Sequence, residues 1–383
     1  MGSIRFRWTT PIFAGFGEIA RLGREARKWG DGALLVTDRT LVELGHAERA
    51  EAALSEAGVR SHRFDRVVPN PTLDVVGACA DRFREVGADL LVGLGGGSAM
   101  DAAKAAGVLV AGGGNLADYE GLGRIRFELP PLIALPTTAG TGSEVTPAAV
   151  VTDPDARHKV NLVSSSLVPR VAILDHDLVV GLPSPLAAET GMDALTHAIE
   201  SFVSSSATPF SEALSRGALR LIAEHLRPFV ANTLNREAAA GMHLAATLAG
   251  AAFANSGLGT VHALSHPLTC YHGIPHGLAN ALLLPAVLEY NLIADLPKFA
   301  EVAETLGEDI QGLPLREGAS AAVEAIRNLI QDLALPSGLG ELGMEETHLD
   351  AMAEDAIATS GTIPIDPRQA DHETLVALYR AAM

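Results

Sequence analysis

Two short segments in the second half of the sequence are rich in side chains that can bind a metal ion. Asp193 and His197 stand four residues apart in GMDALTHAIE. That spacing places two side chains on one face of a helix, about 6 Å apart, which suits two ligands of one metal ion. The second segment, VHALSHPLTCYHGIPHG, contains four histidines: His262, His266, His272 and His276.

Two interpretations of these histidines are open. An isolated histidine on an apolar helix face is more often a core or capping residue than a ligand. Here, however, four of the 13 histidines crowd into a segment made mostly of Ala, Leu, Gly and Pro. Burying several imidazoles and a carboxylate without a partner is costly. A metal ion would supply the partner, and this donor set favours Fe²⁺ or Zn²⁺ over Ca²⁺ or Mg²⁺.

A glycine-rich turn lies in the first half of the sequence. The apolar run LLVGL leads directly into Gly95, Gly96, Gly97 and Ser98, and good helix formers follow. Glycines let the backbone approach a ligand closely, and the N-terminus of the next helix can bind phosphate. The alternative is that the glycines bind no ligand and only form a tight connection between the strand and the helix. The spacing is not G-x-G-x-x-G, so the usual dinucleotide fingerprint is absent.

Two further features could bind parts of a dinucleotide. The loop PTTAGTGSE places Thr137, Thr138 and Ser143 after a third apolar run, where they could contact ribose and pyrophosphate or form an ordinary turn. Asp38 ends the first apolar run. Its carboxylate could bind the adenosine ribose and repel a 2′-phosphate, which would favour NAD over NADP. It could equally cap the helix expected to follow it.

Composition limits the classes of function. A net charge of −18 argues against nucleic acid and anionic membranes as partners. Only two cysteines are present, in no pairing motif, and the first residues, MGSIRFRWTT, lack the pattern of a secretory signal. We therefore expect a cytoplasmic protein. At 383 residues the chain is long enough for two domains.

The elements that must position these residues differ between the two halves. Short apolar runs at 33–37, 90–94, 132–135 and 171–174 predict strands, and helical patterns occupy 40–57 and 74–86. This alternation predicts a Rossmann-like α/β domain with a parallel sheet. After Gly181 the helical period dominates, so we expect a dinucleotide-binding domain at 1–182 and an all-α, metal-binding domain at 183–383. The helical patterns of the second half lie at 189–201, 211–225, 236–253, 320–333 and 373–382.

Four motifs in order resemble those of the iron-containing (group III) alcohol dehydrogenases. They are GGGSAMDAAK, PTTAGTGSEVT, GMDALTHAIE and VHALSHPL…HGIPHGLANALLLP, and the resemblance spans nearly the whole chain. PNPTLDVV and RVAILD also fit, whereas the late Asp366-Pro-Arg stands where the family more often has Asn-Pro-Arg.

The resemblance implies a role for each matching residue. It assigns the metal ion to Asp193, His197, His262 and His276, and it places His266 near the nicotinamide as a proton relay. It implies that a further set binds NAD: Asp38, Asn70, Gly95, Gly96, Gly97, Ser98, Asp101, Thr137, Thr138, Ser143 and Lys159. His272 has no counterpart. Phe253 and residues 359–363 are expected near the substrate.

The implied activity is hydride transfer between a small alcohol and NAD, with the alkoxide bound to a metal ion. The resemblance favours Fe²⁺, although the same ligands would bind Zn²⁺. Alternatives are reductases of lactaldehyde, propanediol, 4-hydroxybutyrate or phosphonoacetaldehyde, a lyase of dehydroquinate synthase type, and a non-catalytic binding protein. Maleylacetate reductases lack the metal ligands that are present here. The segment IRFRWTTPIFAG resembles a hairpin arm, so we expect a homodimer or larger assembly.

Overall fold

The computed structural model describes residues 4–359 and 365–383, and the chain folds into two compact units. One unit is Trp8–Val180, and the other contains Gly181–Met383 together with the N-terminal residues up to Arg7. Residues 4–7 therefore pack with the helical unit, whereas the expected range 1–182 assigned them to the first domain. Arg7 donates its backbone N–H to Asn255 Oδ1 at 2.7 Å, and Phe6 stacks on Phe210.

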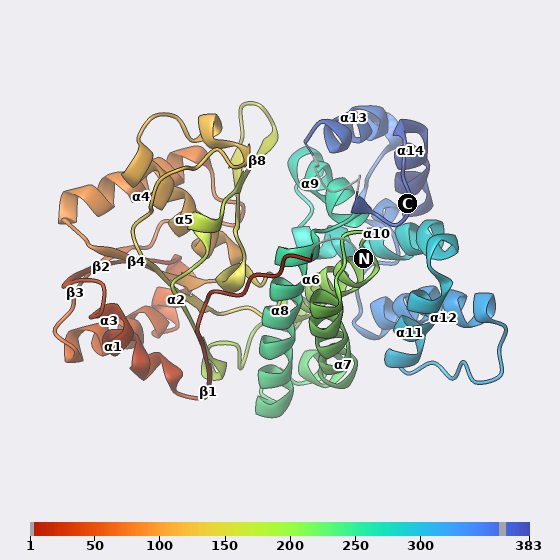
Figure 1. The fold of residues 1–383 in the computed structure, drawn as a ribbon, viewed down its shortest axis with the longest axis horizontal. Coiled ribbons are helices and arrows are strands. Elements are labelled where there is room, and N and C mark those ends of the chain that lie inside the picture. Colours follow the sequence, from red (N-terminus) through yellow and green to blue (C-terminus); the bar gives the residue numbers. More distant parts are fainter. Residues whose placement is uncertain (1–3, 360–364) are drawn as a thin grey trace. The chain divides into compact units, whose positions relative to one another are not determined.

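A parallel sheet of six strands forms the centre of the first unit, in the order β1-β9-β6-β4-β2-β3 (Figure 1). Its strands are β1 (Ile12–Gly15), β2 (Gly32–Val36), β3 (Arg60–Phe64), β4 (Leu90–Gly95), β6 (Leu132–Pro136) and β9 (Val171–Asp175). The four predicted strands are confirmed. Strand β1 pairs in parallel with β9, so the expected hairpin at the N-terminus is wrong.

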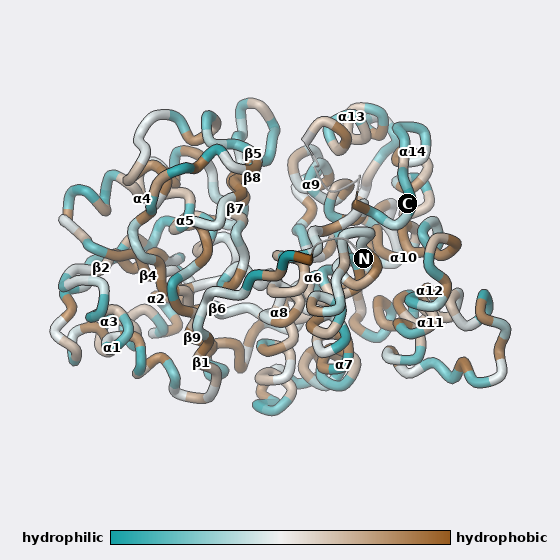
Figure 2. Tube along the Cα trace, viewed as in Figure 1, coloured by the Kyte–Doolittle hydropathy of each residue, from teal (hydrophilic) through white to brown (hydrophobic). Residues whose placement is uncertain are grey.

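Alternate residues of the central strands face two separate apolar cores. Leu34 and Leu91 belong to one core, whereas Leu35 and Val92 belong to the other. Helices cover both faces of the sheet, which explains why the strands read as continuous apolar runs rather than as alternating ones (Figure 2). The helices of this unit are α1 (Leu22–Ala26), α2 (Arg39–Glu43), α3 (His46–Glu56), α4 (Leu73–Val86) and α5 (Gly97–Gly112).

The predicted helix at 40–57 is divided in two. Gly45 has a φ of 76°, in the left-handed region, and separates α2 from α3. Glycine adopts this left-handed conformation without steric cost. The apolar periodicity continues across the break, which is why sequence alone predicts one helix.

A smaller sheet, in the order β5-β8-β7, completes the first unit. Its strands are β5 (Gly121–Leu122), β7 (Ala148–Asp153) and β8 (His158–Val163). Strands β7 and β8 pair antiparallel, with Thr152 opposite Lys159. The sequence analysis did not predict this sheet, because β5 has only two residues and β8 mixes polar with apolar residues.

The second unit contains helices and no strand within residues 181–359 and 365–383. They are α6 (Ser184–Val203), α7 (Pro209–Ala231), α8 (Arg236–Ser256), α9 (Thr260–His272), α10 (His276–Asn291), α11 (Leu296–Thr305), α12 (Leu315–Asp332), α13 (Leu349–Thr359) and α14 (His372–Ala381). Helix α6 packs against α7, α8 and α10. The predicted order, an α/β part followed by an all-helical part, is confirmed.

One helical segment of this unit has the length and the apolar composition that a membrane-spanning helix needs. It is His276–Ala294, 61% of which is buried inside the unit. The same segment begins at a predicted metal ligand and packs on α6 and α9. It therefore has the properties of a core helix.

Candidate functional site

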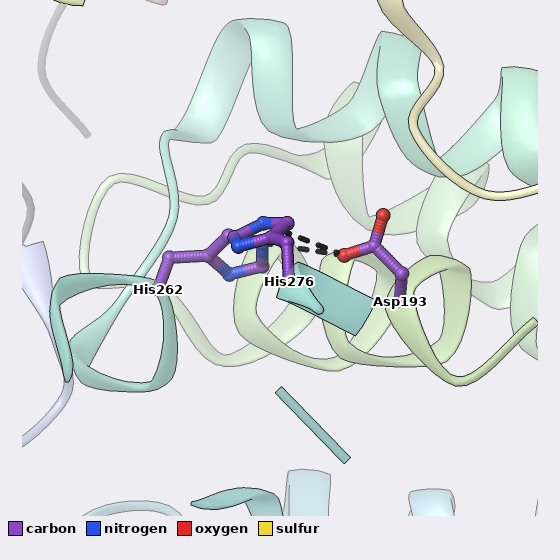
Figure 3. A group of neighbouring side chains, drawn as sticks. All are labelled: Asp193, His262 and His276. Atoms are coloured by element: carbon purple, nitrogen blue, oxygen red, sulfur yellow. Dashed lines mark ion pairs between the residues drawn. The ribbon is translucent and has the colours of Figure 1, made fainter. Parts of the chain in front are cut away.

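Three of the predicted metal ligands converge in the helical unit. Asp193 lies on α6, His262 on α9, and His276 is the first residue of α10. Ligand atoms of these three side chains all lie within 4.8 Å of one another. Both imidazoles point toward the Asp193 carboxylate (Figure 3), with Nε2 to Oδ1 distances of 3.8 Å for His262 and 3.7 Å for His276. These distances are too long for hydrogen bonds and leave the donor atoms around a common point.

The fourth predicted ligand, His197, lies next to this group. Its Nε2 is 3.7 Å from Asp193 Oδ1, and the spacing of four residues does place both side chains on one face of α6. The His197 ring stacks on His262, with ring centroids 4.6 Å apart. Phe253 packs against the same ring at 4.6 Å. The group of atoms within 4.8 Å contains the other three residues only.

Asn280 gives an independent test of whether these residues suit a cation. Its Nδ2 is 2.7 Å from Asp193 Oδ1, 3.1 Å from His262 Nε2 and 3.2 Å from His276 Nε2. One amide nitrogen thus faces three groups that can accept, and it has only two hydrogens to donate. Asn280 Oδ1 is buried without a hydrogen-bond partner among the described residues. The carboxylate and imidazole nitrogens therefore fit a divalent transition metal ion.

The charges in this group are strongly coupled. Burial raises the pKa of Asp193, but the surrounding histidines His197, His262 and His276 outweigh burial and lower it below its usual range. Burial lowers the pKa of His262, but Glu200 and Asp193 outweigh burial and raise it to about 9. The protein on its own thus keeps positive charge beside Asp193. Binding of a metal ion would release protons from this group.

The two remaining histidines of the segment occupy different environments. His266 is half-buried, and its ring centroid is 5.5 Å from that of His276. His272 lies at the end of α9, where its ring is 5.3 Å from that of His348. Within the described residues its Nε2 has no hydrogen-bond partner. Of the expected substrate loop, residues 360–363 lie outside the described residues.

The glycine turn of the first unit leaves little or no room for a side chain at each of its three positions. Gly95 has a φ of 152°, where other residues are strained. A Cβ on Gly96 would lie 3.1 Å from Thr138 Cγ2, and one on Gly97 would lie 2.8 Å from Thr141 Cγ2. No side chain caps the N-terminus of α5. Ala99 N and Met100 N donate to Gly96 O, so an anion at this end of α5 would face the N–H groups of Gly97 and Ser98.

Residues 136–144, the threonine loop, and Asp38 lie beside this turn. Thr137 donates its backbone N–H to Gly95 O at 3.0 Å, because β4 and β6 pair in parallel up to Gly95 and Pro136. Asp38 caps α2 by accepting from Leu41 N at 3.0 Å. Its other oxygen lies 3.9 Å from the position of a Cβ on Gly95. The capping role is therefore confirmed, and the carboxylate is also next to the turn.

Two residues expected to contact the cofactor are engaged inside the protein. Asp101 accepts from Ser143 Oγ at 2.8 Å and from Val150 N at 2.9 Å. Ser143 Oγ also accepts from Lys104 Nζ at 2.8 Å. Burial raises the pKa of Asp101 despite the nearby lysine charge. These contacts connect α5 to the threonine loop and to β7.

Lys159 and Asn70 lie together, as the resemblance implies for two residues of one site. Lys159 Nζ donates to Asn70 Oδ1 at 2.7 Å and to Thr152 Oγ1 at 2.9 Å. Asn70 has a φ of 54°, which is uncommon for a residue other than glycine. This conformation is maintained by the contacts around it.

Comparison with known proteins decides the family. Residues 9–176 match the iron-containing alcohol dehydrogenases, and residues 187–383 match the C-terminal part of the Fe-containing alcohol dehydrogenase family. The chain belongs to the iron-containing alcohol dehydrogenase family. A 1,3-propanediol dehydrogenase of Klebsiella pneumoniae is 42% identical over 355 residues, 92% of each chain. An NAD-dependent methanol dehydrogenase of Bacillus methanolicus is 37% identical over 370 residues, 96% of this chain and 97% of the other.

Solved structures agree with this membership. The crystal structure of a 1,3-propanediol oxidoreductase superposes with a TM-score of 0.96 at 40% identity, covering 99% of this chain and all of the other. The predicted reaction class, oxidation and reduction at CH–OH groups by a metal-dependent dehydrogenase, is confirmed. The expected cofactors, iron and NAD, agree with the family description and with a relative named for its use of NAD.

The sequence analysis of this iron-containing alcohol dehydrogenase missed two charged residues. Lys104 is buried, and its Nζ donates to oxygens of Ser143, Thr146 and Ala148 at 2.7–3.3 Å. Burial lowers its pKa to about 8. Glu200 is buried beside His262. Both have a signal in the sequence, since Lys104 is the only charged residue after Asp101 in an apolar helix and Glu200 continues the face of Asp193 and His197.

Replacing Lys104 by methionine should weaken NADH binding about 10-fold. Methionine fills a similar space but leaves several buried carbonyl and hydroxyl oxygens without a donor, at about 1–3 kcal/mol each. The threonine loop should then move away from α5. Fluorescence titration with NADH measures the effect. Lys28→Met, at a lysine whose side chain is 53% exposed in the same unit, is the control and should change nothing. Equal NADH affinity of K104M and wild type would contradict this role.

Proposed function

We propose that the enzyme interconverts a short-chain alcohol and its aldehyde, with NAD(H) as the hydride carrier. The observation that carries the proposal is the convergence of Asp193, His262 and His276, buried or partly buried, on one point. The relatives support a small substrate, since one is named for 1,3-propanediol and another for methanol. 1,3-Propanediol is therefore the first alcohol to test.

The metal ion is held in this proposal by Asp193, His262 and His276, with His197 as the fourth ligand. A bound divalent ion would act as a Lewis acid that makes the alcohol oxygen more acidic. His197 is next to Asp193 and packs on Phe253, so a small movement of one ring would complete the set. The family favours Fe²⁺, and Zn²⁺ suits the same donors.

The first unit binds the dinucleotide in this proposal. Gly95, Gly96, Gly97 and Ser98 accommodate the pyrophosphate at the N-terminus of α5. Thr137 and Thr138 lie beside the turn, and Lys159 with Asn70 completes the polar surroundings. Asp101 and Ser143 fix the loop through the hydrogen bond between them, and Lys104 supports it by donating to Ser143. His266, close to His276, would take up the proton that the alcohol loses.

Asp38 makes a prediction about the choice between NAD and NADP. Asp38→Asn should raise the preference for NADPH relative to NADH about 10-fold, or about 1.4 kcal/mol. Asparagine caps a helix as well as aspartate, so α2 should remain intact while the negative charge that repels a 2′-phosphate is removed. Steady-state kinetics with both cofactors measure the ratio. An unchanged ratio would assign Asp38 to capping alone.

Cytoplasmic location and a homodimer complete the proposal. The N-terminal segment adds apolar surface to the helical unit, where Ile4 is 44% exposed and Phe210 is 55% exposed. A second copy of the chain would cover such side chains. Sedimentation that gives a monomer at micromolar concentration would contradict the dimer.

Metal removal tests the function as a whole. The protein is purified anaerobically, its metal content is measured, and NADH oxidation is followed with a series of short aldehydes before and after chelation. About one Fe or Zn per chain is expected, with activity that chelation removes and the metal restores. A protein that contains no metal, and that added metal does not activate with any aldehyde, would contradict the proposed function.

A further inference from the structure

The first turn of α9 carries His262, and a single buried carboxylate holds both the backbone and the ring. Glu200 Oε1 accepts from Val261 N at 2.7 Å. Glu200 Oε2 lies 2.6 Å from His262 Nδ1. Glu200 is 4% exposed, so water does not compete strongly for either contact. The position of the imidazole is thus coupled to the start of the helix.

A second buried carboxylate occupies the other side of the same turn. Asp366 Oδ2 accepts from Thr260 N at 3.2 Å and from Asn291 Nδ2 at 3.3 Å. Between the two carboxylates lies Gly259, where a Cβ would overlap Asp366 Oδ1 and lie 2.9 Å from Glu200 Oε1. The absence of a side chain at Gly259 allows both carboxylates to reach the backbone of α9. Because Asp366 takes Thr260 N, Glu200 is left to Val261 and His262.

We propose that Glu200 is a positioning residue that keeps the proton of neutral His262 on Nδ1, so that Nε2 presents its lone pair toward Asp193. This rests on the proposed function, since it deepens the role of the same metal site. An ionised carboxylate has no hydrogen to donate, so a close contact with Nδ1 requires Nδ1–H. Carboxylates that accept from the second nitrogen of a ligating histidine fix its tautomer and raise its basicity.

Glu200→Gln tests this assignment, because an amide cannot serve both partners in the same way. If the amide oxygen accepts from Val261 N, the amide NH₂ faces Nδ1 and favours the tautomer with the proton on Nε2. If the amide is turned around, its NH₂ faces the Val261 N–H instead. The first arrangement is favoured, because the Val261 N–H can only donate whereas Nδ1 can accept after a change of tautomer, and this arrangement opposes metal binding at Nε2. Affinity for Co²⁺, measured by chelator competition and by visible absorbance, should fall about 10- to 100-fold.

Matched variants separate positioning from general damage. Glu200→Asp keeps the acceptor chemistry on a shorter side chain and should recover part of the Co²⁺ affinity lost in E200Q. Asp366→Asn keeps an oxygen for Thr260 N and should bind Co²⁺ within about 3-fold of wild type. NADH affinity, a property of the first unit in the proposed function, should be the same in all three variants. Equal Co²⁺ affinity of E200Q and wild type would overturn the proposal.

A measurement of the His262 tautomer tests the role of Glu200 separately from the proposed metal site. In metal-free protein, at a pH high enough that His262 is neutral, nitrogen NMR of labelled histidine reports which ring nitrogen carries the proton. Wild type should carry it on Nδ1 and E200Q on Nε2. If wild type binds no Co²⁺ yet shows this difference, the metal site is wrong and the role of Glu200 stands. A proton on Nε2 in wild type would overturn the role of Glu200.

Discussion

Replacing Asp193 by asparagine should lower both metal affinity and kcat/KM for alcohol oxidation at least about 100-fold. Asp193 supplies the only carboxylate of the group of three, and Nε2 of His197, His262 and His276 each lies 3.7–3.8 Å from its Oδ1. The side chain is 4% exposed, so water cannot replace the lost charge. An amide of the same shape keeps the packing and removes the strongest anionic donor. Metal content and steady-state kinetics measure the result.

The control for this substitution is Asp350→Asn, in α13 of the same unit, where the side chain is 83% exposed. It should leave metal content and kinetics unchanged. NADH affinity should be unchanged in both variants, because the proposed dinucleotide residues belong to the other unit. A D193N enzyme that keeps about one metal ion per chain and full activity would show that the histidines alone hold the metal ion, and would remove Asp193 from the proposed site.

The strands and helices follow from patterns that lie within short segments. The runs GALLV, LLVGLG and LIALP are apolar throughout, and the structure buries each on both faces of the parallel sheet. The break at Gly45 is different, since one residue with a φ of 76° changes the direction of the chain without changing the apolar period. The smaller sheet was missed because its residues do not form a continuous apolar run. Its strand β8, HKVNLV, mixes polar and apolar residues.

The sequence predicts candidate ligands of the site but not the contacts between residues of different helices. Spacing identified Asp193 with His197 because both lie on one helix, and composition identified the histidine segment. Neither property could show that Asn280 donates to Asp193, since the two residues come from different helices. The same limit applies to Lys104, whose acceptors lie about 40 residues later in the chain. Burial of a charge is decided by tertiary packing, and so are the partners that make it tolerable.

The assignments of Asp101 and Ser143 illustrate a second limit. A motif match identifies residues that belong to a site but does not separate those that contact a ligand from those that support them. Here Asp101 bonds to Ser143 and to the backbone of Val150, so its carboxylate stabilises the loop from inside. Asp38 shows the converse, because it caps a helix and also borders the glycine turn.

Replacing Gly97 by valine should weaken NADH binding at least about 10-fold while the metal ion remains bound. A Cβ at this position would lie 2.8 Å from Thr141 Cγ2, closer than side-chain carbons approach in proteins, so the threonine loop must move away from the first turn of α5. The branched side chain would also cover the N–H groups that are proposed to bind the pyrophosphate. Fluorescence titration with NADH measures the affinity, and metal analysis provides the internal reference.

Gly77→Val is the matched control for this last substitution. Gly77 lies in α4 of the same unit, and a Cβ there would meet nothing within 4 Å. Both substitutions replace a helical glycine by a β-branched residue, so their effects on helix propensity should be similar. A difference in NADH affinity between the two variants therefore reports on the contact with Thr141 and on access to the turn. If G97V and G77V bind NADH equally well, the glycine turn is only a tight connection between β4 and α5, and the dinucleotide must bind elsewhere.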